Sequence, residues 1–290
     1  MTTSTIDPAL RIGAVELAVS DLQRSADFYE RVLGLPLVSN DDETAVLGPD
    51  REHPALVLRR LASPIPEPQG ATGLFHVAWL HPSRASLAET VRRVAAGGWH
   101  FDGASDHGVS EALYLSDPDG LGIEIYADRP RERWQRPPEG KGVRMYTLPL
   151  DLDDLLAQAA EPTTAMAPGS GVGHVHLKVA DVDRTDSFYR DVLGFEEQVR
   201  IPSAAFLSAG GYHHHLGLNS WQSRGGSPAP ENAPGLRRVD FELGGAEALE
   251  QLAQGPAGAA LQVADGVNES PAERISLRDP DEQLLTFGQS

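Results

Sequence analysis

The sequence predicts an α+β fold built from two tandem copies of one domain, because strings from its first half return in its second. The recurring strings are Gly13-Ala14-Val15, Phe28-Tyr29 and Val32-Leu33-Gly34, which return 160 residues later as Gly173-His174-Val175, Phe188-Tyr189 and Val192-Leu193-Gly194. The turn-like string Asp117-Pro118-Asp119 also returns, as Asp279-Pro280-Asp281. A repeat that keeps its register over most of the chain indicates duplicated structural units.

The first copy begins with a β-α-β-β-β pattern. Alternating apolar residues predict a strand over Ile12–Val19, and Ser20-Asp21 can cap a helix that ends at Gly34. Short runs of β-forming residues predict strands over 44–47 and 55–58. A Pro- and Gly-rich connection follows at 64–73.

The same pattern is repeated within the first copy. Residues 74–80 read as a strand and residues 83–96 as a helix that stops at Gly97-Gly98. Paired strands over 112–115 and 122–126 flank the Asp-Pro-Asp-Gly turn. Two such units per copy make four in the chain.

These patterns divide the chain into two domains and a linker. We expect an N-terminal domain over residues 1–128 and a C-terminal domain over 171–290. Proline recurs between them, over 129–170, around one helical stretch predicted at 151–160.

Composition limits the classes of function. A net charge of −18 argues against general nucleic-acid binding and against attachment to an anionic membrane, since basic patches drive both. The chain has no cysteine, so a bound metal must be held by His and carboxylate side chains. The first residues lack a signal-peptide pattern, and no apolar run approaches the ~18 residues of a membrane span. The default expectation is a cytoplasmic protein.

The repeated strings resemble those of the vicinal oxygen chelate superfamily, which includes glyoxalases, bleomycin-resistance proteins and extradiol dioxygenases. Within it, residues 110–120, 126–130 and 210–219 are similar to bacterial catechol 2,3-dioxygenases of the small two-domain type. The resemblance covers nearly the whole chain. It implies cupped, barrel-like mixed sheets with helices outside.

The resemblance implies metal ligands on inward-facing positions of such sheets. His174 matches the first-strand position, and alternation places it with His176 and Lys178 on the polar face of its strand. That face lines a cavity or is solvated. The string H-x-L-G-L implies His214 as a ligand, although alternation alone does not separate it from the pair His213 and His215.

Ligand-type residues are missing from the first and fourth units. The first copy has Ala14 where the second has His174, and the second has Thr286 where the first has Glu124. The retained residues lie in the middle units and are His76, Glu124, His174 and His214. A sheet shared by the two middle units would bring these four residues together. His76 is expected either as a fourth ligand or as a catalytic histidine beside the metal.

Two imidazoles and a carboxylate with open positions suit Fe(II), with Zn, Ni or Mn as alternatives. The resemblance implies extradiol ring cleavage of a small aromatic catechol by dioxygen. Candidate bases are His107, which we favour, His76 and His215, and Tyr126 is expected to bond the substrate. The alternatives are a glyoxalase-like lyase or isomerase and a metal-free binding protein of the bleomycin-resistance type. A homo-oligomer is possible in each case.

Overall fold

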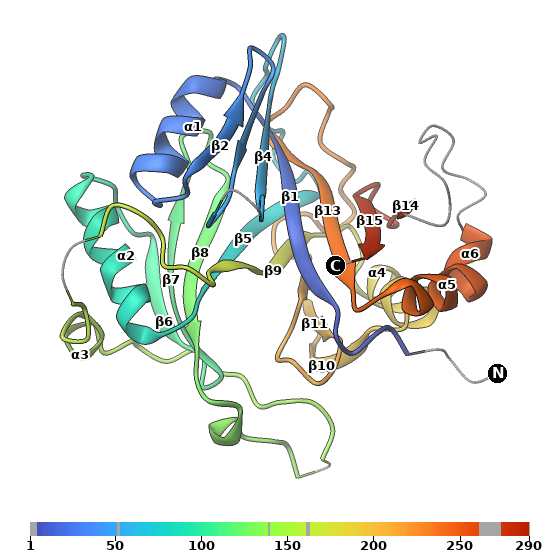
Figure 1. Ribbon diagram of the computed structural model, residues 1–290. Coiled ribbons are helices and arrows are strands. Elements are labelled where there is room, and N and C mark those ends of the chain that lie inside the picture. The colour runs from blue at the N-terminus through green and yellow to red at the C-terminus, as the bar shows by residue number, and fades with distance from the viewer. Residues whose placement is uncertain (1–4, 51–52, 139, 161–162, 261–273, 290) are drawn as a thin grey trace.

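The computed structural model describes residues 5–50, 53–138, 140–160, 163–260 and 274–289. Within these ranges the strands form two mixed sheets (Figure 1). One sheet contains, in spatial order, β14 (Arg274–Arg278), β15 (Leu284–Gln289), β13 (Gly235–Leu243), β1 (Arg11–Val19), β4 (Leu56–Arg60), β3 (Thr44–Leu47) and β2 (Leu37–Asn40). The other contains β10 (Glu196–Ile201), β11 (Ala204–Ser208), β12 (Leu216–Asn219), β9 (Gly171–Lys178), β5 (Gly73–His81), β8 (Gly122–Asp128), β7 (Ser110–Ser116) and β6 (Gly103–Asp106).

Each sheet combines strands from both halves of the chain. The antiparallel pair β5–β9 joins the second unit to the third, and the antiparallel pair β1–β13 joins the first unit to the fourth. The topology therefore confirms that the two middle units share a sheet. The domain boundaries at residues 128 and 171 remain a prediction.

The longer helices lie outside the sheets, where their apolar faces cover the core (Figure 1). The helices are α1 (Leu22–Arg31), α2 (Arg84–Ala96), α3 (Leu152–Leu156), α4 (Val182–Ser187), α5 (Ala246–Gln254) and α6 (Pro256–Ala260), with the short 3₁₀ helix η1 (Arg131–Arg133) and the short π-helix η2 (Phe188–Val192). Asp21 caps α1, as the sequence predicts, and Ser83 caps α2. None of the described helices is long and apolar enough to cross a membrane.

The helix predicted at 151–160 is shorter in the structure. Asp151 accepts the hydrogen bond of Asp154 N and so caps α3, but the helix ends at Leu156. Only Leu155 of this helix is buried, so little apolar packing is available to extend it.

A buried tyrosine ties the two units of each half together. Tyr29, from the first unit, donates a hydrogen bond to Asp117 in the turn of the second unit, at 3.2 Å. Tyr189 donates in the same way to Asp279, at 3.0 Å. The duplicated Asp-Pro-Asp turns therefore connect units that lie in different sheets.

Candidate metal centre and active site

Three ligand-type side chains meet on one face of the sheet formed by the middle units. Nε2 of His76 lies 3.0 Å from Oε2 of Glu124, and Nε2 of His174 lies 3.2 Å from the same oxygen. All three side chains are buried. Among the described residues these three form the group whose ligand atoms lie close enough together to hold one metal ion.

The strand register explains why these residues meet. Ala78, on the central strand β5, is paired with His174 on β9 and with Glu124 on β8. His76 lies two residues earlier on β5 and therefore points to the same face. Ala78 is fully buried and small, so the two ligands on the flanking strands can approach each other above it.

Burial and charge oppose each other in this group. Burial alone raises the pKa of Glu124, but His174 and His76 reverse the effect and hold its pKa well below the usual range. Burial lowers the pKa of His174 to about 4, against the opposing influence of Glu124. Glu124 is therefore present as a carboxylate and His174 as a neutral imidazole, which are the forms that bind metal ions.

The geometry fits a metal ion. Nε2 of His76 is buried and forms no hydrogen bond with the described residues, despite its closeness to Glu124. Two ligand atoms at right angles around an ion, each at about 2.1 Å from it, lie about 3.0 Å apart. The two separations at Glu124 Oε2 are close to this value.

The side chains of the His triplet have different surroundings: His214 lines one cavity and His215 another. His214 lies beside the group, with its ring centroid 4.0 Å from that of His174, but it is not a member of the three-ligand group. Burial lowers the pKa of His214 well below its usual value, which keeps the ring neutral. His215 accepts a hydrogen bond from Ala209 N and lines a separate cavity of about 740 Å³.

His107 faces the group across a pocket, and a tyrosine stands between them. Nδ1 of His107 lies 2.8 Å from the carbonyl oxygen of Tyr146, so it carries the proton, and Nε2 accepts from the Tyr114 hydroxyl at 2.7 Å. Burial raises the pKa of Tyr114 strongly, and nearby Glu124 raises it further. Tyr114 is paired with Glu124 across β7 and β8.

Tyr126 supports the centre without lining this pocket. Its ring centroid lies 4.9 Å from that of His174, and its hydroxyl is 2.8 Å from the hydroxyl of Tyr212. Gly173 makes room for this hydroxyl, because a Cβ atom at that position would lie 1.8 Å from the oxygen. The predicted bond from Tyr126 to a substrate therefore has no support in this geometry.

Two members of the three-ligand group, His76 and Glu124, line a pocket of about 450 Å³. Its walls are mainly aromatic and apolar: Phe75, Tyr114, Met145, Tyr146, Val199, Ile201, Phe206 and Trp221. His176 also lines the pocket, and burial keeps its pKa well below the usual value. A volume of this size suits a small organic ligand.

Several wall residues were absent from the sequence prediction. Tyr114 could have been identified from strand pairing, because it lies opposite Glu124 on the same face. Met145, Tyr146 and Thr147 lie in the predicted linker, where their contribution to a pocket has no signal in the local sequence. The bridge between Asp106 and Leu148 holds this segment against β6.

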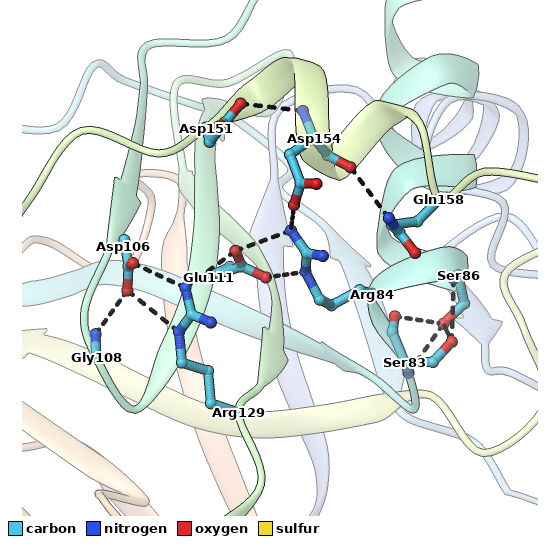
Figure 2. A network of polar contacts seen from close by, with 10 residues as sticks. All are labelled: Ser83, Arg84, Ser86, Asp106, Gly108, Glu111, Arg129, Asp151, Asp154 and Gln158. Atoms are coloured by element: carbon cyan, nitrogen blue, oxygen red, sulfur yellow. Dashed lines mark hydrogen bonds and ion pairs between the residues drawn. The ribbon is translucent and has the colours of Figure 1, made fainter. Parts of the chain in front are cut away.

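An ionic network around the buried Glu111 supports the segment that carries His107 (Figure 2). Glu111 is buried and bonds two arginines: Arg84, from the start of α2, and Arg129 at 3.1 Å. Arg129 also bonds Asp106 at 2.8 Å, and Asp106 accepts the hydrogen bond of Gly108 N. The residues on both sides of His107 are therefore fixed from the helix side of the sheet.

The comparisons with known proteins agree with this fold. A family model for the Glyoxalase/Bleomycin resistance protein/Dioxygenase superfamily matches residues 11–125 and 171–287. Because these ranges make up most of the sequence, the chain belongs to this superfamily.

A more specific similarity is to the Catechol-2,3-dioxygenase of Bacillus subtilis (strain 168). The two sequences are 42% identical over 254 residues, which cover 86% of this chain and 88% of that protein. A solved structure from Bacillus subtilis subsp. subtilis str. 168 has a TM-score of 0.67 at 17% identity, over 99% of this chain and 86% of that one. Glyoxalase I from Zea mays has a TM-score of 0.55 at 17% identity, over 97% and 92%. The two structural similarities show the shared fold.

Proposed function

We propose that this protein is an Fe(II)-dependent extradiol dioxygenase that opens the ring of catechol-type compounds. The observation that carries the proposal is the His76–Glu124–His174 group, of which His76 and Glu124 line an aromatic pocket of about 450 Å³. The 42% identity to a catechol-2,3-dioxygenase over most of both chains supports the same reaction.

The donor set favours iron. Two imidazoles and one carboxylate on one side of an ion, with the remaining positions open, are typical of non-haem Fe(II) oxygenases. In this proposal His76, His174 and Glu124 hold the ion. When bound, the iron would supply a Lewis acid and a redox centre that brings a catechol and dioxygen together.

The aromatic walls would hold a flat substrate over the group. Phe75 and Trp221 lie edge to face with centroids 5.3 Å apart, and Trp221 remains half exposed at the mouth of the pocket. Aromatic walls of this kind exclude water from around the ring of a bound substrate. The edge of that ring that carries the hydroxyl groups can then face the buried polar residues.

Two groups are suited to move the protons of a catechol. His214 lines the pocket directly beside His174, and its burial keeps it neutral and able to accept a proton. Tyr114 offers a hydroxyl that is bonded to His107, so we assign His107 to the support of Tyr114. His215 lines the other cavity and has no part in this assignment.

In this proposal the reactants are a small aromatic substrate and dioxygen. A cytoplasmic location and a homo-oligomeric state stay predictions.

Turnover after anaerobic loading with Fe(II) tests the proposal. Catechol and air should give a yellow ring-opened product, and Glu124→Ala should abolish it because the variant lacks the carboxylate ligand. Zn or Ni loading should give no product, since ring cleavage needs a redox-active ion.

The negative outcome separates the alternatives. A protein that binds iron stoichiometrically but leaves catechols unchanged would contradict the dioxygenase assignment for simple catechols. Activity with Zn or Ni on a glyoxalase-type substrate would then favour a lyase or isomerase. Tight binding of an aromatic ligand without metal would favour a binding protein.

A further inference from the structure

A chain of buried hydrogen bonds leads away from His214 on the side opposite the pocket. Nδ1 of His214 lies 2.8 Å from Nδ1 of His213, and Nε2 of His213 lies 2.8 Å from Oδ1 of Asp128. The Tyr212 hydroxyl donates to the same Asp128 oxygen, at 3.2 Å. Asp128 ends β8, so this chain links the strand that carries Glu124 to the segment before β12.

His213 is held rigidly within this chain. Its side chain is fully buried, and its ring centroid lies 4.0 Å from that of Tyr212 and 5.4 Å from that of Trp134. Both of its ring nitrogens have hydrogen-bond partners, so a flipped ring would lose two bonds.

When His213 is neutral, the direction of each hydrogen bond follows from the chemistry of the groups. An ionised carboxylate only accepts, so Nε2 of His213 carries the proton in its bond to Asp128. In the neutral ring the other nitrogen, Nδ1, is then an acceptor. Nδ1 of His214 must therefore carry a proton and donate it, which leaves Nε2 of a neutral His214 with a free lone pair.

We propose that Asp128 and His213 select the tautomer of His214 in which Nε2 is unprotonated, so that His214 is ready to accept a proton in the pocket. Asp128 and His213 are then positioning residues for the reaction. The described residues provide no hydrogen bond to Nε2 of His214, whose ring lines the pocket. The role of this tautomer in turnover rests on the proposed function, whereas the presence of the tautomer in the protein does not depend on it.

The tautomer can be read directly from the metal-free protein. In ¹⁵N-histidine-labelled protein, the His214 signals, assigned by their loss in His214→Gln, should show a protonated Nδ1 and an unprotonated Nε2. His213→Leu and Asp128→Ala should each replace this spectrum by a mixture of both tautomers. A wild-type His214 protonated at Nε2 would overturn the inference.

The iron-loaded protein provides the second measurement. Because positioned proton transfer contributes about 10²–10⁴-fold to rates, we expect kcat to fall roughly 10- to 100-fold in His213→Leu and Asp128→Ala. KM for catechol and iron content should stay within about twofold, because neither residue is in the three-ligand group. Unchanged kcat in both variants, or iron loss in proportion to activity, would overturn the positioning role.

A matched control is available in the first half of the chain. His53 and Asp50 form another His–Asp contact, at 2.8 Å, but the His53 side chain is 73% exposed and lies outside the pocket. His53→Leu should leave kcat and the His214 signals unchanged. If wild-type protein fails to cleave catechol, the proposed function fails, while the NMR result still decides the tautomer.

Discussion

At the scale of single residues, the size of Ala78 is decisive for the centre. Ala78 is fully buried and lies between His174 and Glu124 in the cross-strand row. Ala78→Leu adds three carbons where neighbouring Cβ atoms are about 5 Å apart, and overpacking of this kind costs about 1–3 kcal/mol. We expect its iron content to fall at least roughly tenfold when metal is measured after reconstitution and desalting.

The matched control for this prediction is Ala127→Leu. Ala127 is also buried, but it lies on the opposite face of β8 from Glu124. The control should lose stability by a similar amount and keep its iron. Full iron content in Ala78→Leu would show that a small residue between His174 and Glu124 is not required for metal binding.

His81 is one of the buried histidines that make the stability of the fold depend on pH. It is buried, its ring nitrogens have no hydrogen-bond partner among the described residues, and burial together with Arg93 lowers its pKa to about 3. In the unfolded chain its pKa is near 6.5, so acidification protonates the unfolded state first. Stability linked to His81 is thus present above pH 6.5 and is lost as the pH falls toward 3.

The size of this effect can be measured by urea unfolding of the metal-free protein at pH 7 and pH 5. The linkage relation gives a loss of about 2 kcal/mol from His81 between these values. His81→Leu should therefore lose about 2 kcal/mol less than wild type over the same interval. An identical pH dependence in both proteins would show that His81 is not held neutral.

At the scale of elements, the two Asp-Pro-Asp turns depend on the tyrosines that reach them from α1 and from η2. Tyr29 and Tyr189 are both fully buried, and each donates to the turn aspartate of its own half. Tyr29→Phe and Tyr189→Phe should each lower the free energy of unfolding by about 1–3 kcal/mol, because a buried carboxylate loses a donor.

Urea denaturation measures both changes, and Tyr146→Phe serves as the control. The described residues offer no hydrogen-bond partner to the Tyr146 hydroxyl, and this side chain is partly exposed. If Tyr146→Phe were as destabilising as the other two, the loss would reflect ring packing and not the turns.

The elements also show where sequence prediction worked and where it stopped. Strands β3 and β8 and the cap of α1 follow local patterns, so the sequence located them within one or two residues. The His triplet lies in a turn before β12, where strand alternation gives no guidance on which side each ring faces. Tyr114 and the Tyr146 segment enter the pocket through tertiary pairing, which single segments do not encode.

At the scale of the whole molecule, each sheet contains strands from both halves of the chain, and this should make unfolding cooperative. Neither sheet survives the loss of one half, because β5 pairs with β9 and β1 pairs with β13. We expect one calorimetric transition in the metal-free protein, with equal calorimetric and van't Hoff enthalpies. Two separate transitions would indicate that the halves fold independently.

The arrangement of the strands also explains why the middle units keep ligand-type residues while the first and fourth units lack them. Ala14 and Thr286 belong to β1 and β15 of the other sheet, whereas the group lies on β5, β8 and β9. The prediction that the middle units share a sheet came from this pattern of retained residues. It did not depend on the strength of any single motif.

The most direct test of a metal centre shared by the two halves is the iron content of single-ligand variants. Glu124 comes from the first half and His174 from the second, and both bind the same ion in this account. After anaerobic reconstitution, wild type should hold one iron per chain, while Glu124→Ala and His174→Ala should each hold almost none, with unchanged circular dichroism. Full iron content in either variant would contradict a centre built from both halves.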